Sequence, residues 1–142
     1  MEVILDTNVL SILQAGRTPI RDRVENRLLR EPNSLVFATI VSFQEQTRGW
    51  LASVNHSKSD SQLLLAYAEL QKLLENYRKL QVLPFEDQSL ATFHDLRRQR
   101  VRIGTRDLRI AAIALARGAK VITQNFRDFE KVPGLLVEDW TV

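Results

Sequence analysis

The sequence contains no cysteine. This absence excludes disulfide bonds, thiolate zinc sites and cysteine nucleophiles, and it is typical of a protein that works in a reducing cytoplasm. Histidine is also scarce, since only His56 and His94 are present, so a histidine-based metal site or a Ser-His-Asp triad is poorly supplied. Any metal ion would therefore have to be held by oxygen atoms, which favours hard cations such as Mg²⁺ or Mn²⁺.

Long apolar runs and targeting segments are absent as well. No stretch approaches the roughly 20 apolar residues that a membrane-spanning helix needs, and residues 1–5 show no signal-peptide pattern. We therefore expect a cytoplasmic protein with no membrane contact. A glycine-rich phosphate loop with lysine is missing too, which excludes a P-loop nucleotide switch. With 142 residues, 44% of them hydrophobic, the chain should form one domain over residues 1–142.

Charge is nearly balanced, at a formal net +3, but arginine is unevenly spread. Six arginines fall in one short stretch: Arg97, Arg98, Arg100, Arg102, Arg106 and Arg109. Such a local basic patch is compatible with a phosphate-bearing partner. For the first four of these arginines, a solvated helix face is an equal alternative.

The hydrophobic pattern predicts short strands that alternate with helices. We expect strands at 3–5, 35–38, 81–83 and 120–123, with a further one at 135–137. We expect helices from Val9 to near Gly16, after Pro19, and at 41–54, 60–77, 87–101 and 105–117. This order predicts an α/β fold with a central parallel sheet of four or five short strands and helices on both faces. In such folds, ligands bind beyond the carboxyl ends of the strands.

Two carboxylates in the first third of the chain are candidates for chemistry, and each has a structural alternative. Asp6 directly follows the first predicted strand and could simply cap the next helix. Its place at a strand end in the sheet centre favours function, because a charge there needs a partner. Glu45 closes the pattern Ser42-Phe43-Gln44-Glu45, which matches a capping box, and taken alone this capping role is narrowly favoured.

Further polar candidates lie near the C-terminal strands. Asp107 could complement the dipole of a first helical turn. However, residues 110–116 are almost all small or apolar, so that helix should pack closely on the sheet and aim its N-terminus at the strand ends. Asn125 and Asp128 follow the strand that ends at Thr123, although Asp128 could merely start a turn. Several carboxylates at one sheet edge would repel each other unless they were protonated or neutralised by a cation.

Four segments together resemble the PIN-domain nucleases, and among these the VapC-type toxins of bacterial toxin–antitoxin systems. The segments are Val3–Leu10, Thr39–Glu45, Gly104–Ala112 and Val121–Phe129, followed by Pro133-Gly134-Leu135 and Asp139-Trp140. They occur in the family's order and spacing and cover essentially the whole chain. The first segment alone would be a weak signal, whereas the four together are specific.

The resemblance implies a role for individual residues. Asp6, Glu45 and Asp107 correspond to the family's first, second and third acids. The chain departs from the family at the fourth position, where many relatives have an acid and this sequence has Asn125. Either Asp128, one helical turn later, supplies the missing charge, or Asn125 orients a metal-bound water. Thr7, Asn8 and Thr123 are then expected to support the metal ligands from behind.

The resemblance also implies an activity and partners. It indicates a metal-dependent endoribonuclease that holds one or two Mg²⁺ or Mn²⁺ ions through Asp6, Glu45 and Asp107, with Asn125 and Asp128. Arg106 and Arg109 are expected to contact RNA phosphates, although Arg109 could equally pair with a carboxylate of the site. A cognate antitoxin and a homodimer are implied, and the helix at 60–77 is a candidate contact unless it serves only core packing.

Two alternatives belong to other classes of protein. A catalytically degenerate PIN domain would bind RNA or protein without cutting, and Asn125 is the feature that favours it. A phosphatase of the haloacid-dehalogenase type also begins with a strand followed by aspartate. That chemistry needs a second aspartate two residues later, where this chain has Asn8.

Overall fold

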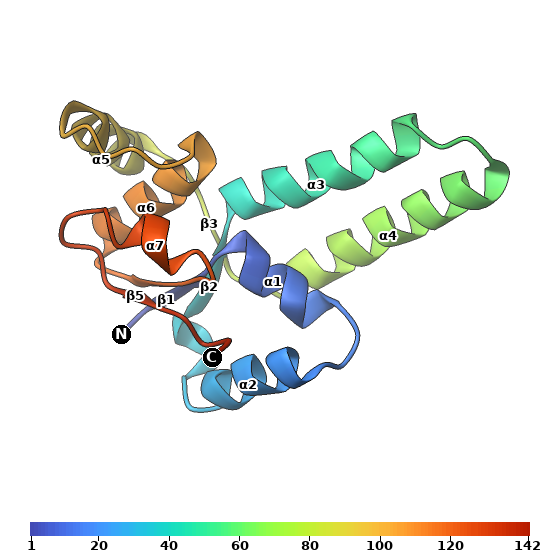
Figure 1. Ribbon diagram of the computed structural model, residues 1–142, viewed down its shortest axis with the longest axis horizontal. Helices are drawn as coiled ribbons and strands as arrows, with labels where there is room; N and C mark the ends of the chain where they lie inside the picture. The colour runs from blue at the N-terminus through green and yellow to red at the C-terminus, as the bar shows by residue number, and fades with distance from the viewer.

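A five-stranded parallel sheet forms the centre of the computed structural model, which describes all residues from Met1 to Val142 (Figure 1). The strands are β1 (Val3–Leu5), β2 (Val36–Thr39), β3 (Val82–Leu83), β4 (Lys120–Ile122) and β5 (Val137–Glu138). They lie in the order β3-β2-β1-β4-β5, and every neighbouring pair is parallel. The predicted sheet is therefore confirmed, with β5 beginning two residues later than expected.

Helices connect the strands and cover both faces of the sheet. They are α1 (Thr7–Gln14), α2 (Pro19–Leu28), α3 (Ile40–Asn55), α4 (Asp60–Arg78), α5 (Asp87–Arg98), α6 (Thr105–Arg117) and α7 (Phe126–Phe129), with a 3-10 turn at Asn33–Leu35. The sequence pattern did not indicate α7 or the 3-10 turn, because neither is long enough to show a period. The helix predicted at 87–101 ends early, at Arg98, because Arg100 adopts a φ of 61° that α-helix cannot continue.

Successive side chains of a strand point to opposite faces of the sheet, so the hydrophobic core has two parts. Ile4 faces the side that α5 and α6 cover, while Val3 and Leu5 face the side of α1, α2 and the base of α4. Both residue sets are fully buried, as is usual for parallel strands with helices on each face. This burial explains why the strands read as continuous apolar runs.

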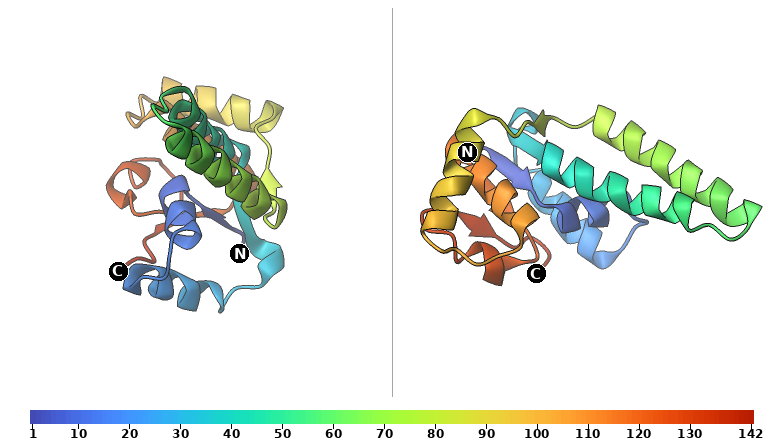
Figure 2. Two further views of the ribbon diagram at one scale, coloured as in Figure 1. Left: turned by 90° about the vertical axis from the view of Figure 1, so that its right-hand side faces the viewer. Right: turned by 90° about the horizontal axis from the view of Figure 1, so that it is seen from above.

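The pair α3 and α4 forms a long hairpin that extends away from the sheet (Figures 1 and 2). Its base is held in the core, where Leu73 and Tyr77 of α4 are buried. Nearer the tip, Leu64, Leu65 and Tyr67 are exposed. Core packing thus accounts for only part of the apolar surface of α4. No helix of the chain combines the length and the apolar character needed to cross a membrane.

The order of the strands fixes where a ligand could bind. The chain passes from β1 outward through β2 to β3 and then returns to β4 on the other side of β1. A crevice at the carboxyl ends of β1 and β4 is the expected binding place in such a sheet, because the connections diverge there to opposite sides. Asp6 and Thr123 directly follow these two strands.

Candidate active site

Asp6 lies at the carboxyl end of the central strand and is 3% exposed. Its backbone N–H donates to the carbonyl of Ile122 at 2.9 Å, which joins it to β4. Its side chain caps α1, since Oδ1 accepts a hydrogen bond from the Thr7 N–H at 2.8 Å. The capping role weighed for this residue is therefore real, but it occupies only one of the two carboxylate oxygens.

Thr123 holds the other oxygen of Asp6. Its hydroxyl donates to Asp6 Oδ2 at 2.7 Å and accepts from the Asn125 backbone N–H at 2.9 Å. Asn8 joins this group, because its Nδ2 lies 3.4 Å from Thr123 Oγ1 and its Oδ1 accepts from the Gln124 N–H at 3.2 Å. Thr123 thus contacts Asp6 directly and Asn8 contacts Thr123, while their support of metal ligands stays a prediction.

Glu45 reaches the same edge from α3. The cap of α3 is Thr39, whose Oγ1 accepts from the Ser42 N–H at 3.2 Å, so the helix begins before the pattern that suggested a capping box. The capping interpretation of Glu45 was wrong for this reason. Glu45 Oε1 instead accepts from the Thr7 hydroxyl at 3.1 Å, and that hydroxyl lies 2.8 Å from Ser42 Oγ. Thr7 therefore links α1 to Glu45.

Asp107 stands in the first turn of α6 and is joined to Asp128 through Asn125. Asn125 Nδ2 donates to Asp107 Oδ2 at 3.1 Å and to Asp128 Oδ2 at 2.9 Å. Asp128 lies in α7 on the exposed side, 3.4 Å from Lys131 Nζ. Asn125 hence occupies the position between the two carboxylates and serves them as a hydrogen-bond donor.

Asp6, Glu45 and Asp107, the inner carboxylates of the site, all have raised pKa values. Burial raises the pKa of Asp6 from 3.8 to about 6, and the charges of Asp107 and Glu45 act in the same direction. Burial also raises the pKa of Glu45 and that of Asp107, and the charge of Asp107 adds to the rise at Glu45. Asp128 behaves oppositely, because the hydrogen bond from Asn125 holds its pKa below the ordinary value. The inner group therefore favours a proton or a cation.

The donor set at this edge suits a hard divalent cation, because it consists of carboxylate, amide and hydroxyl oxygens. None of Asp6, Glu45 and Asp107 is engaged in an ion pair. Their side chains nevertheless do not already surround one point, since no group of three acidic or histidine residues is close enough together to hold an ion as it stands. Binding an ion would require these side chains to draw together.

The two arginines expected to contact RNA lie in different surroundings. Arg106 is exposed and near enough to the carboxylates for its charge to lower the pKa of both Glu45 and Asp107. Arg109 lies with its guanidinium 5.7 Å from the ring centroid of Phe93 and lines a cleft that also includes His94. It forms no ion pair, so the alternative in which Arg109 pairs with a carboxylate of the site is wrong.

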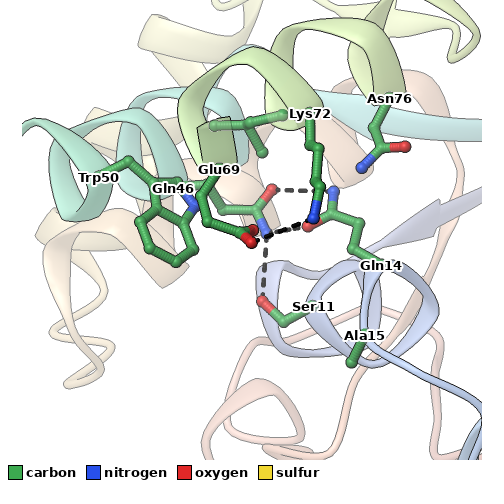
Figure 3. A pocket seen from close by; sticks show the side chains of 9 residues that line it. Ser11, Gln14, Ala15, Gln46, Trp50, Glu69, Lys72 and Asn76 are labelled. Carbon is green, nitrogen blue, oxygen red and sulfur yellow. Dashed lines mark hydrogen bonds and ion pairs between the residues drawn. The ribbon is translucent and has the colours of Figure 1, made fainter. Parts of the chain in front are cut away.

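A polar network behind Glu45 was not foreseen from the sequence. Gln46 Nε2 donates to Ser11 Oγ at 3.1 Å and to Gln14 Oε1 at 2.7 Å, and Gln46 Oε1 accepts from the Tyr77 hydroxyl at 2.6 Å. Ser11, Gln14 and Gln46 line a cavity of ≈ 290 Å³ between α1, α3 and α4 (Figure 3). Ser42 was also missed as a partner of Thr7, although its i, i+3 spacing from Glu45 places both on one helix face.

Comparison with known proteins gives a family for this geometry. The family model described as "PIN domain" matches residues 3–135 of the chain. A curated relative, "Ribonuclease VapC1" of Haemophilus influenzae (strain R2866), is 29% identical over 141 residues, which are 99% of each chain. The "tRNA(fMet)-specific endonuclease VapC" of Salmonella typhimurium is 38% identical over 66 residues, which are 44% of this chain and 50% of that protein.

Solved structures agree with this result. The chain is similar to one in the crystal structure of DNA-bound VapBC from Salmonella typhimurium, with a TM-score of 0.72, 27% identity, and coverage of 99% of this chain and 98% of that one. It is also similar to one in the structure of VapBC-1 from nontypeable Haemophilus influenzae, with a TM-score of 0.71, 26% identity and full coverage of both chains, 100% each.

Proposed function

The chain belongs to the PIN-domain family, and from this membership and its site we propose that it is an endoribonuclease that hydrolyses RNA phosphodiester bonds. The observation that carries the proposal is the grouping of Asp6, Glu45 and Asp107. They come from β1–α1, α3 and α6, burial raises the pKa of each, and none of them forms an ion pair. Relatives with this architecture are named ribonucleases.

We further propose that the site uses Mg²⁺ or Mn²⁺. Asp6, Glu45 and Asp107 would hold the metal, which would supply an activated water and offset the charge that develops on the phosphate. Asn125 would either approach as a fourth ligand through its amide oxygen or, as the structure has it, align Asp107 and Asp128 by donating to both. Asp128 then acts at the outer rim of the site.

The remaining polar residues have positioning roles in this proposal. Thr123 fixes one oxygen of Asp6 and leaves the carboxylate in a single orientation. Thr7 places Glu45 relative to α1, and Asn8 holds the segment after β4. Arg106 supplies a cation at the rim and is suited to contact a backbone phosphate, because a guanidinium matches phosphate oxygens with two parallel hydrogen bonds. Arg109 packs against Phe93, and its contact with an RNA phosphate stays a prediction.

The biological setting we propose is the toxin of a toxin–antitoxin pair. The similar chains in solved structures come from VapBC complexes, so we propose that a cognate antitoxin protein silences this chain. We also propose a homodimer, with the exposed apolar surface of α4 as the contact. That surface consists of Leu64, Leu65, Tyr67 and Leu74.

The direct test offers the purified chain single-stranded and structured RNAs with Mg²⁺, with Mn²⁺ or with chelator. We expect cleavage only with metal and a loss of at least about a hundredfold in Asp6→Asn and Asp107→Asn. Thr92→Val, at a half-buried helical threonine on α5 whose hydroxyl bonds the Gln88 carbonyl, serves as a control that should cut normally. Cleavage that persists in chelator, or that survives Asp6→Asn, contradicts the proposal.

A second function is favoured by one observation, which is that Asn125 replaces an acid and donates to Asp107 and Asp128. A PIN domain with a weakened metal site would bind RNA or protein without cutting. The same experiment separates the two functions, because this one predicts tight RNA binding with no metal-dependent turnover. Asn125→Asp should then create or increase cleavage.

A further inference from the structure

The connection between α5 and α6 concentrates positive charge around a hollow. Residues 96–106 contain five arginines and no acid. Arg97, Arg100, Arg102 and Thr105 line a cavity of ≈ 510 Å³ whose remaining lining is apolar. We call this cavity and these four residues that line it the arginine hollow. Because three of the arginines border one cavity, they do not simply fan out into solvent from a helix face.

The charges of this hollow are not balanced within the molecule. Arg98 pairs with Asp95, but Arg98 does not line the hollow. Arg97 lies with its guanidinium 5.0 Å from the ring centroid of Phe93 and forms no ion pair. Arg100 and Arg102 take part in no ion pair. Like charges held together without a counter-ion favour binding of an anion.

Arg100 occupies a backbone position that suits glycine better than arginine. At the end of α5, Arg100 N–H donates to the Arg97 carbonyl and Val101 N–H to the Leu96 carbonyl. At the end of α6, Gly118 and Ala119 form the same two bonds, to Leu115 and Ala114. The φ values are 61° for Arg100 and 67° for Gly118. An L-residue in this left-handed conformation is strained, whereas glycine is not.

The same chain thus uses glycine at the end of α6 and a strained arginine at the equivalent place after α5. Strained backbone positions of this kind are held by the surrounding structure and cluster at functional sites. Since Arg100 makes no ion pair inside the molecule and lines the hollow with Arg97 and Arg102, its use should involve something that enters the hollow.

The hollow adjoins the carboxylates along the first turn of α6. Thr105 lines the hollow, Asp107 faces Asn125, and the charge of Arg106 between them acts on Glu45 and Asp107. Arg102 is five residues from Asp107, a span of at most ~18 Å even in extended chain. An extended strand cut at the carboxylates would therefore reach the hollow within a few nucleotides.

We propose that the arginine hollow binds backbone phosphates of the RNA strand, a few nucleotides from the bond that is cut. The identity of the ligand as RNA rests on the proposed function, while the preference for phosphate rests on the arginines themselves, whose forked donors match phosphate oxygens. Such contacts position a strand without reading its bases. The hollow would thus strengthen binding of long substrates and leave the chemical step unchanged.

The test measures binding of a fluorescent single-stranded 12-nucleotide RNA in chelator, where the proposed cleavage does not interfere. For Arg102→Gln and Arg100→Gly we expect several-fold weaker binding at moderate salt. The slope of log K against log salt should fall by about 0.7 for each phosphate of the single strand that the variant no longer neutralises. Arg78→Gln is the matched control, because Arg78 is an exposed arginine at the end of α4, beside Glu75 and Lys79.

Arg100→Gly separates a binding role from a structural one. Glycine relieves the strain, so this variant should melt no lower than the wild type while binding RNA less tightly. In cleavage assays, the hollow variants should show a higher KM for the 12-nucleotide RNA and an unchanged kcat. A short substrate that spans only the cut bond and its immediate neighbours should be cut at the wild-type rate.

The possible outcomes are distinct. An unchanged salt slope in Arg100→Gly and Arg102→Gln, or no binding of RNA at all, overturns the proposal. If the slope changes as expected but no RNA is ever cut with metal, the hollow is a phosphate site and the nuclease function fails. If RNA is cut but the slope stays unchanged, the nuclease function holds and the hollow has no part in it.

Discussion

At the scale of single residues, Asp6 combines two roles that conflict energetically. Its carboxylate stabilises the start of α1 by accepting from the Thr7 N–H, yet burial and the charges of Asp107 and Glu45 disfavour its ionised form. The cap requires an acceptor but does not require a full charge, because asparagine caps helices about as well. The charge therefore serves the site and not the fold.

This conflict predicts how stability depends on pH in chelator. The folded pKa of Asp6 is about 6 and its ordinary value is 3.8, so the folded state retains a proton that the unfolded state releases between these values. Stability should accordingly fall as pH rises from about 4 to 6, by up to about 3 kcal/mol. Asp6→Asn should remove most of this fall and be the more stable protein at pH 7. Urea unfolding at pH 4 and pH 7 measures both effects, and an equal fall in the variant would show that Asp6 is not the cause.

A second prediction concerns Thr123, whose hydroxyl donates to Asp6 Oδ2 at 2.7 Å. Thr123→Val keeps the shape but removes the donor, so Asp6 loses its fixed orientation. Partners that orient a metal ligand are typically worth 10–100-fold in metal affinity or activity, and we expect a rise of that size in the metal concentration for half-maximal cleavage. Thr123→Ser retains the hydroxyl and should stay within a few-fold of the wild type. If valine and serine behave alike, the hydroxyl does not act on Asp6.

At the scale of elements, the site depends on how α1, α3 and α4 are joined. Glu45 on α3 meets Thr7 on α1, and the neighbouring Gln46 also binds Tyr77 of α4. Figure 3 shows Gln46 bound to Ser11 and Gln14 of α1. Phe43 packs edge-on against Tyr77, with ring centroids 5.0 Å apart. The spacing of Glu45 from Asp6 is thus set by contacts that lie behind the carboxylates.

The substitution Tyr77→Phe tests the connection between α3 and α4. It removes one hydrogen bond to Gln46 and should lower the free energy of unfolding by about 1 kcal/mol. Because Gln46 adjoins Glu45, we also expect kcat to fall several-fold with KM for RNA nearly unchanged. Thr92→Val is the control, since it removes a helical hydroxyl on α5 that bonds only the Gln88 carbonyl. A Tyr77 variant with lower stability but full kcat would confine the network to a structural role.

At the scale of the whole molecule, the α3–α4 hairpin gives the chain an elongated shape that its own core does not require (Figures 1 and 2). Leu64 is 70% exposed and Leu65 is 62% exposed on this hairpin. Neighbouring leucines so far out of the core are typical of an interface. This surface is the basis of the proposed dimer contact.

The dimer prediction is tested by the mass in solution. The wild type should have twice the mass of one chain by light scattering, and the double variant Leu64→Gln with Leu65→Gln should shift toward the monomer. Leu29→Gln, at an exposed leucine outside the hairpin, should leave the mass unchanged. A double variant that remains fully dimeric would place the contact elsewhere and leave the hairpin for the antitoxin.

The sequence alone determined the layers of the fold and the candidate residues of the active site. Short apolar runs separated by helical periods indicated the parallel sheet, because strands buried on both faces must be apolar throughout. Asp6, Asp107 and Thr123 could be placed at strand ends or helix starts, since these positions follow from local pattern. The shared role of Glu45 needed the family resemblance, because its local pattern favoured a cap.

Only the tertiary structure decided which side chains meet. In the structure, Asn125 donates hydrogen bonds to two carboxylates, and Arg109 packs against Phe93. Gln46 binds Tyr77, which is 31 residues away in the sequence. The tertiary structure also brought Arg97, Arg100 and Arg102 to one hollow and strained Arg100. Local pattern cannot reveal such contacts, because they depend on how separate elements pack and not on the period of any one of them.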